Sequence, residues 1–257
     1  MPAPPPETRT PDRYRAPALD KGLDILEILA TQPGAMTRGD IVRAMGRSPS
    51  EIYRMLERLV ARGYVARIEG GDRYILTMKL FLLAHRHPPL RRAVAQAQPL
   101  MDGFAQDTRQ SCHLVMPENG MGIVIAQASP DENWEFRIRV GARLDLFETG
   151  SGLTLLAFQH PDRRAETLKS WGITAPEARF DAIAPHLARI RAEGCRQAPS
   201  RQLVGVTDLS APVLGPDGDG IGVLTCAYIE RPGDAGHSDR ERALTRLRAV
   251  TEALSHR

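Results

Sequence analysis

The sequence of 257 residues has few of the features that mark membrane or disulfide-stabilised proteins. No uninterrupted apolar run approaches the roughly 18 residues needed to cross a bilayer, and the N-terminal segment MPAPPPETRTPDRYR has no apolar stretch typical of a secretory signal. We therefore expect a cytoplasmic protein without a membrane partner. The only cysteines are Cys112, Cys195 and Cys226, with no C-x-x-C pair, which argues against a disulfide framework and against a cysteine-rich zinc site.

Motifs typical of enzymes are also missing. The sequence contains no G-x-x-x-x-G-K-[ST], no H-E-x-x-H and no G-x-S-x-G. Its seven histidines have no metal-ligand spacing except His85-x-His87, which precedes two prolines and is interpreted as part of a loop. The run GDGIG at 218–222 is similar to a dinucleotide-binding loop, but it leads into a predicted strand, so we predict a turn there. We accordingly predict no catalytic residue, no metal site and no cofactor.

Charge is distributed unevenly along the chain. Residues 1–90 carry 14 Lys and Arg against 10 Asp and Glu, a net charge of +4, whereas residues 91–257 carry 20 against 21, a net charge of −1. A basic segment on an otherwise neutral chain favours a polyanionic partner for the N-terminal third. The first 17 residues hold six prolines and few apolar side chains, so residues 1–17 are predicted to form a disordered arm.

Two helices are predicted directly after this arm. Apolar residues recur at helical spacing from Leu19 onward, until the run QPG at 32–34 stops the pattern. Thr37 and Asp40 resemble a capping box for a short second helix, which ends at Gly46.

A third helix is predicted to begin after Ser48. Its hydroxyl is placed to accept a hydrogen bond from the Glu51 amide, the Glu51 carboxylate can return to the Ser48 amide, and Pro49 occupies the first helical position. An apolar stripe from Ile52 to Val60 leaves a polar face opposite. Alternating segments at 64–68 and 73–76, on either side of EGGD, then predict a β-hairpin.

This order of elements predicts a winged helix-turn-helix over residues 18–80. A helix that packs by one stripe and presents hydroxyl, phenol and guanidinium groups on the other side fits the DNA major groove, and the hairpin can reach the adjacent backbone or minor groove. The candidate DNA-binding residues are Ser48, Ser50, Tyr53, Arg54, Arg58, Arg67 and Arg73. Winged helices also serve as protein-docking modules, and that alternative stays open here.

The rest of the chain predicts an α+β organisation. A linker helix region covers 81–110, with a helix over 90–110 that Pro99 should kink, and a mixed sheet domain covers 111–257. The predicted strands lie at 112–116, 122–128, 135–140, 203–206, 211–214 and 220–229, and the predicted helices at about 152–159, at about 180–193 and from about 238. The run GSG at 150–152 opens one of these helices and can turn backbone amides toward an anion.

Several segments together resemble the isocitrate-lyase-regulator (IclR) family of bacterial transcription factors. They are ALDKGLDILEILA, MTRGDIVRAMGRSPSEIYRMLERLVARGYV, RYILTMKLFLLA, VGARLDLFETGSGLTLLAF, LARIRAEGC and VGVTDLSAPVLGPDGDGIGVLTCAYIERP. The resemblance runs from about Leu19 to the end of the sequence. It implies a winged helix-turn-helix joined by a linker helix to a GAF-like effector domain, assembled as a homodimer or a dimer of dimers on operator DNA.

The resemblance also implies a small-molecule effector, either an organic acid or an aromatic catabolite, that modulates operator affinity, usually for repression of a catabolic operon. The effector positions of the family fall on Gly150, Ser151, Asp208, Thr225 and Ala227, with Leu146 a candidate for an apolar wall. Asp208 stands where many members have cysteine, and Ala198 where an acidic residue is usual.

Asp208 leaves the chemical class of the effector open. An ionised aspartate in a closed pocket repels a carboxylate unless an arginine or a proton compensates, so a polyol, an amine or a hydroxylated ring fits as well. Alternatively, Asp208 faces away from the pocket and pairs with Arg201 or Arg143. The rival hypothesis from another class is an enzymatic or small-molecule-binding C-terminal domain joined to a protein-docking winged helix.

Overall fold

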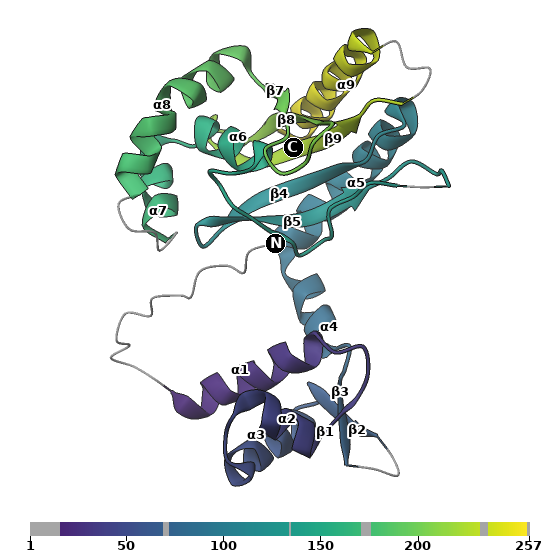
Figure 1. Ribbon diagram of the computed structural model, residues 1–257, viewed down its shortest axis with the longest axis vertical. Helices are drawn as coiled ribbons and strands as arrows, with labels where there is room; N and C mark the ends of the chain where they lie inside the picture. Colours follow the sequence, from purple (N-terminus) through teal and green to yellow (C-terminus); the bar gives the residue numbers. More distant parts are fainter. Residues whose placement is uncertain (1–15, 69–71, 134, 171–175, 232–235, 256–257) are drawn as a thin grey trace. The chain divides into compact units, whose positions relative to one another are not determined.

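The computed structural model describes residues 16–68, 72–133, 135–170, 176–231 and 236–255. Most of the predicted arm (1–15) and the tip of the predicted hairpin (69–71) lie outside the described residues. The chain forms two compact units that divide after Arg91 (Figure 1). No helix in the described ranges combines the length and apolar character that a bilayer span requires.

The N-terminal unit has the predicted order of a winged helix-turn-helix. Its elements are α1 (Pro17–Ala30), β1 (Met36–Thr37), α2 (Arg38–Met45), α3 (Pro49–Ala61), β2 (Val65–Ile68), β3 (Arg73–Leu76) and α4 (Lys79–Arg86). Strand β1 was not predicted. It pairs antiparallel with β3, with Met36 opposite Tyr74, so the wing is a three-stranded sheet of order β1-β3-β2.

One apolar cluster holds the helices and the wing of this unit together. Its buried members are Ile25, Leu29, Ile41, Ile52, Leu56, Val65 and Tyr74. Two of them, Ile52 and Leu56, come from the apolar stripe predicted for α3, and both are completely buried. Burial of this stripe removes apolar surface from water and directs the opposite face of α3 outward.

The capping prediction is confirmed for α2. The Thr37 hydroxyl accepts a hydrogen bond from the Asp40 amide at 3.1 Å, and the Asp40 carboxylate accepts one from the Thr37 amide at 3.0 Å. A hydrogen bond from the Thr37 hydroxyl to the Asp40 carboxylate, at 2.7 Å, and then the one from the Thr37 amide lower the pKa of Asp40. Gly46 ends the helix with φ of 58°, a left-handed conformation that glycine adopts without a steric penalty.

One half of the capping box predicted for α3 is wrong, although the helix begins where expected and the Glu51 carboxylate accepts from the Ser48 amide as predicted. Ser48 occupies the cap position with extended backbone, but its hydroxyl accepts no hydrogen bond from the helix amides. The hydroxyl faces side chains instead, with its Oγ 3.5 Å from the Ser50 Oγ. Hydrogen bonds from Lys21, at 2.6 Å, and then from the Ser48 hydroxyl lower the pKa of Glu51. The Ser48 hydroxyl therefore bonds to the Glu51 carboxylate and not to the backbone amides of α3.

Two helices stand where one linker helix was predicted. Helix α4 includes His85, so the loop interpretation of His85 is wrong, and α5 (Pro88–Thr108) follows the extended residue His87. Proline disfavours helical backbone in the residue before it, which explains a break at His87. Pro99 lies inside α5.

The C-terminal unit is built on an antiparallel sheet of six strands. After α5 its elements are β4 (Cys112–Glu118), β5 (Met121–Ala128), β6 (Arg143–Leu144), α6 (Gly150–Phe158), α7 (Pro161–Ser170), α8 (Pro176–Glu193), β7 (Arg196–Pro199), β8 (Val206–Leu214), β9 (Gly220–Ile229) and α9 (His237–Ser255). The strand order is β6-β5-β4-β9-β8-β7. The chain is thus a mixed α+β protein, as predicted.

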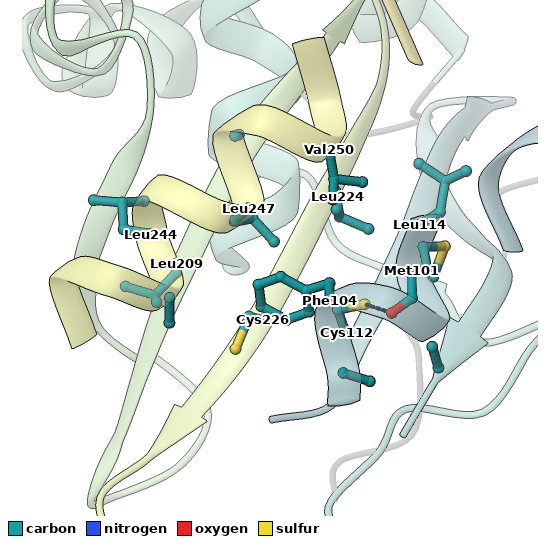
Figure 2. Close-up of a cluster of buried hydrophobic side chains, with 14 of the residues drawn as sticks. Met101, Phe104, Cys112, Leu114, Leu209, Leu224, Cys226, Leu244, Leu247 and Val250 are labelled. Atoms are coloured by element: carbon teal, nitrogen blue, oxygen red, sulfur yellow. Dashed lines mark hydrogen bonds between the residues drawn. The ribbon is translucent and has the colours of Figure 1, made fainter. Parts of the chain in front are cut away.

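One face of this sheet is apolar and is covered by α5 and α9 (Figure 2). Cys112, Cys226 and Leu209 lie opposite one another on β4, β9 and β8 and contribute to this core together with Phe104 of α5 and Leu247 of α9. All three cysteines of the chain are free and buried. Alternate residues of the same strands point to the other face, where α6 packs.

Two strand predictions in this unit are wrong. Residues 135–140 form no strand, and the chain reaches β5 only afterwards, where the Gly141 amide donates to the Val124 carbonyl at 2.7 Å. Of the predicted strand 203–206 only Val206 lies in a strand, at the start of β8, whereas residues 204–205 form a turn in which the apolar Val204 is fully exposed. The edge strand next to β8 is β7, whose sequence RQAP has no apolar alternation and ends in a proline that an edge position tolerates. Helix α7 was not predicted either.

Candidate functional site

The polar face of α3 is the first candidate site. Ser48, Ser50, Tyr53, Arg54 and Arg58 are all exposed, so the structure brings the five predicted helix residues together on one accessible surface. Arg54 and Arg58 lie one helical turn apart. Neither guanidinium forms an ion pair within the part of the chain that the structure describes. This face therefore offers two uncompensated positive charges.

Tyr53 is held by a residue that sequence reasoning missed. The guanidinium carbon of Arg38 lies 5.6 Å from the centroid of the Tyr53 ring, a cation–π geometry between the start of α2 and the middle of α3. The Nε atom of Arg38 is 3.5 Å from a carboxylate oxygen of Asp72, next to the hairpin. No sequence pattern links these three residues, because the pairing depends on how α2, α3 and the wing pack.

The two wing arginines, Arg67 and Arg73, lie on opposite faces of the hairpin. Arg67 is in register with Tyr74, which is buried, and its Nη2 atom is 3.6 Å from Asp72. Arg73 precedes Tyr74 and so points to the other face, where it donates to the Ala35 carbonyl at 3.4 Å. Both side chains are exposed, but the structure does not place them together.

The second candidate site lies in the C-terminal unit, where α6 begins against the sheet (Figure 1). Thr149 caps α6, since its hydroxyl accepts from the Gly152 amide at 3.0 Å. This cap helps to place Gly150 and Ser151 in the first turn, beside β8 and β9. The sequence prediction of a helix that opens with GSG is confirmed.

Ser151 belongs to a buried chain of hydroxyl groups. Its Oγ is 2.8 Å from the Oγ1 of Thr225, which donates to the Oγ of Ser210 at 2.9 Å. On its other side the Ser151 Oγ is 3.4 Å from Nε2 of His113. Burial lowers the pKa of His113 to about 4, so this imidazole is neutral at pH 7. The cluster unites the predicted Ser151 and Thr225 with two residues that were not predicted.

Asp208 faces this site, and the alternative that it pairs with Arg201 or Arg143 is wrong. Its carboxylate is buried, and Oδ2 lies 3.6 Å from Nη1 of Arg196 on the neighbouring strand. Burial raises the pKa of Asp208, while Arg196, the Ser200 hydroxyl and the Gly150 amide lower it. Sequence reasoning missed Arg196, although an arginine was one of the two ways it gave for compensating this charge, a proton being the other.

The remaining effector candidates have different surroundings. Ala227 lies opposite Asp208 on β9 and is half-buried. Leu146 is completely buried in the apolar cluster that α6 forms with α7 and α8. Its backbone lies against Gly152, where an added Cβ would be 2.3 Å from the Leu146 Cα. The Leu146 backbone thus packs against the first turn of α6 at Gly152.

Two family models match this chain. The IclR helix-turn-helix domain matches residues 18–69, and the bacterial transcriptional regulator IclR C-terminal domain matches residues 91–256. The chain belongs to the IclR family. Both candidate sites of this IclR-family transcriptional regulator fall within the matched ranges, α3 in the first and the start of α6 in the second.

Curated relatives of this IclR-family protein are transcriptional regulators. The regulator BhcR of Paracoccus denitrificans is 27% identical over 214 residues, which cover 79% of this chain and 74% of BhcR. The DNA-binding transcriptional repressor YiaJ of Escherichia coli is 24% identical over 208 residues, which cover 77% of this chain and 72% of YiaJ.

Solved structures show the same architecture. An IclR homologue from Microbacterium hydrocarbonoxydans, complexed with 4-hydroxybenzoate, is 25% identical with a TM-score of 0.73 and covers 93% of this IclR-family chain and 98% of its own. HmgR of Pseudomonas aeruginosa is 25% identical with a TM-score of 0.70 and covers 94% of this chain and 98% of its own.

Proposed function

We propose that this IclR-family regulator binds operator DNA through α3 and the wing, and that a small molecule bound in the C-terminal unit changes its affinity for that operator. The observation that carries the first half is the exposed face of α3, where Arg54 and Arg58 have no carboxylate partner among the described residues. By contrast, Arg38, Arg43 and Arg67 all pair with aspartates. Unpaired guanidinium groups one turn apart suit a guanine edge and a phosphate.

In the complex, α3 lies in the major groove and the wing lies beside it. Ser48 and Ser50 bind phosphate at the start of the helix, Tyr53 contacts a phosphate or a thymine methyl group, and Arg54 reads a base edge. Arg67 and Arg73 contact the flanking backbone or the minor groove from opposite faces of the hairpin. With Arg58 on a neighbouring phosphate, this assignment uses all seven candidate residues.

Effector control needs two arrangements of the molecule that bind the ligand unequally, since a ligand shifts an equilibrium only by its differential affinity. The buried polar cluster at the start of α6 supports a ligand site in the C-terminal unit. A related IclR homologue is solved with 4-hydroxybenzoate, which supports a small catabolite as the ligand class. Relatives that include a transcriptional repressor and the glycerol operon regulatory protein of Streptomyces griseus support repression of a catabolic operon.

The same proposal includes assembly as a homodimer or a dimer of dimers. Helix α4 exposes a run of large apolar side chains, Leu80, Phe81, Leu82 and Leu83, directly after the exposed Met78. Contiguous exposed apolar surface of this kind marks an interaction site. A dimer would present two copies of α3 to the two halves of a palindromic operator.

The experiment that tests the proposed function is a titration of the full chain on labelled DNA from its own upstream region, over a series of salt concentrations. A protein that contacts phosphates releases counterions, so the logarithm of its affinity falls linearly with the logarithm of the salt concentration. We expect this slope, and tighter binding to the upstream DNA than to shuffled DNA. Absence of DNA binding at low salt would refute the proposal and favour a docking role for the winged helix.

A further inference from the structure

Asp72, directly before β3, joins the wing to the start of α2. Its carbonyl oxygen accepts a hydrogen bond from the Arg38 amide at 3.3 Å. Its carboxylate lies between two guanidinium groups, with 3.5 Å from Oδ2 to Nε of Arg38 and 3.6 Å from Oδ1 to Nη2 of Arg67. Both approaches are longer than an ordinary hydrogen bond. One carboxylate thus faces two arginines that come from different elements, α2 and β2.

A third partner fixes this carboxylate from the core. The hydroxyl of Tyr74, whose ring lies in the apolar cluster of the unit, donates to Oδ1 of Asp72 at 3.1 Å. Burial and then the bond with Asp72 raise the pKa of Tyr74, so the phenol keeps its proton and remains the donor. The Asp72 side chain itself is 41% exposed. Exposed ion pairs are weak because water screens them, so a phosphate can replace the carboxylate at both arginines.

The Arg38 side chain connects Asp72 to the exposed face of α3. Its guanidinium carbon lies 5.6 Å from the centroid of the Tyr53 ring. Tyr53 is exposed on the face that also carries Arg54 and Arg58. A guanidinium that stacks on a ring by its flat face keeps its N–H edges for an anion. Arg38 therefore presents donors next to the proposed DNA-binding surface, although it is not one of the seven candidate residues.

Arg67 meets the same carboxylate from the wing. The proposed function places this arginine on the DNA, yet in the free protein its guanidinium faces Asp72. The side chains of Arg67 and Arg38 are 55% and 44% exposed, so both are accessible. Phosphate and carboxylate oxygens are alternative acceptors for the same guanidinium donors. A DNA phosphate therefore binds to either arginine only in competition with Asp72.

We propose that Asp72 occupies the place of a DNA phosphate in the free protein, and that Arg38 and Arg67 exchange this carboxylate for phosphates when DNA binds. The inference rests on the proposed function and deepens it, since it adds Arg38 to the DNA contacts and makes Asp72 a positioning residue for two of them. Asp72 keeps the two like charges close to each other, which their mutual repulsion opposes. Phosphates are the same on every sequence, so the competition weakens binding to all DNA by the same factor.

Neutralising Asp72 tests the competition. The full chain and its Asp72→Asn variant are titrated on labelled upstream DNA and on shuffled DNA. The asparagine keeps an oxygen that accepts from Tyr74, so the variant should melt at the wild-type temperature. We expect it to bind both DNAs about three- to tenfold more tightly, the combined value of two exposed ion pairs. Unchanged or weaker binding to both DNAs would overturn the inference.

A second carboxylate controls for net charge. Asp24 is exposed on α1 of the same unit, and Asp24→Asn removes the same single negative charge. It should bind both DNAs like the wild type, because solvent and salt screen a charge that lies away from the phosphates. A gain equal to that of Asp72→Asn would assign the effect to net charge and overturn the inference.

Salt dependence assigns the new contact to Arg38. Arg38→Gln should weaken binding to both DNAs, and the slope of log affinity against log salt concentration should become shallower by about 0.9, the value of one lost phosphate contact. Arg248→Gln, at an exposed arginine of α9 in the other unit, is the matched control and should keep the wild-type slope. A wild-type slope in Arg38→Gln would overturn the inference, and this result decides if Asp72→Asn does not fold.

A double-mutant cycle separates exchange from simple repulsion. If Asp72 acts through the arginines, Asp72→Asn should raise affinity by a smaller factor in the Arg38→Gln background than in the wild type, because one of the two exchanging groups is gone. An undiminished gain in that background would show that the carboxylate only repels phosphates, which would overturn the exchange.

The wild-type titration keeps this test apart from that of the proposed function. A wild-type chain that binds upstream DNA, together with an Asp72→Asn variant that gains nothing, refutes the exchange alone. A wild-type chain that binds no DNA at low salt refutes the proposed function and the exchange with it.

Discussion

The imidazole of His113 and the hydroxyl of Ser151 meet in the interior of the C-terminal unit, with 3.4 Å between Nε2 and Oγ. They come from β4 and from the first turn of α6, 38 positions apart in the sequence. Burial lowers the pKa of His113 to about 4, so the contact joins a neutral ring to a hydroxyl group. Protonation of this ring would place a charge under α6 without a paired anion.

This contact predicts a loss of stability in weak acid. An unfolded chain binds the His113 proton near pH 6.5 and the folded chain near pH 4, so the free energy of unfolding declines as the pH falls between these values. From pH 7.5 to pH 5.5 we expect a decrease of about 1 kcal/mol from this residue. Urea unfolding at the two pH values measures it.

His113→Gln should remove this part of the pH dependence, because the amide keeps a polar contact with Ser151 but does not titrate. His160→Gln is the control, since His160 is exposed and should retain the wild-type difference between the two pH values. Identical pH dependence in His113→Gln and the wild type would show that His113 is not buried neutral.

The two helix starts of the winged domain should respond differently to loss of a hydroxyl. Thr37→Ala removes the cap of α2 and should lower the stability of this unit by about 1 kcal/mol. Ser48→Ala should cost clearly less, because the Ser48 hydroxyl accepts no hydrogen bond from the α3 backbone. Thermal unfolding of both variants provides the comparison, and an equal loss would restore the capping role predicted for Ser48.

Gly152 is required by the close approach of α6 to the chain at Leu146. A Cβ at this position would lie 2.3 Å from the Leu146 Cα and 2.5 Å from its carbonyl oxygen, and backbone atoms cannot give way as a flexible side chain can. Gly152→Ala should therefore destabilise the protein by about 3 kcal/mol, the upper end of overpacking effects. Gly34→Ala is the control, because its Cβ would meet no atom within 4 Å. Equal melting temperatures for the two variants would contradict this packing.

Arg54 should carry base specificity. Arg54→Ala is expected to weaken binding to the upstream DNA by about 1–3 kcal/mol, with a smaller effect on shuffled DNA, as loss of a base-edge contact requires. Fluorescence anisotropy on both DNAs measures the difference. Arg248→Ala, an exposed arginine of α9, controls for loss of one positive charge. An equal loss on both DNAs would reassign Arg54 to a phosphate contact.

Local patterns in the sequence were sufficient for most of the winged domain. The stripe that includes Ile52 and Leu56 and the Thr37–Asp40 capping box are interactions between residues a few positions apart, so periodicity and spacing reveal them directly. The Ser48 prediction failed because the Ser48 hydroxyl bonds to the Glu51 carboxylate, which also accepts from Lys21, 30 positions away in the sequence. Strand β1 also escaped prediction, since two residues carry no periodic pattern.

In the C-terminal unit, local sequence patterns predicted the elements but not the contacts between them. The sequence by itself determined the order of most helices and strands, the family resemblance, and the presence of a helix that opens with GSG near the effector positions. Only the tertiary structure decided that Arg196, Ser210, Thr225 and His113 form one row and that Arg196 accompanies Asp208. Pairing between distant strands sets that row, because register depends on which strands become neighbours and how the whole face is buried.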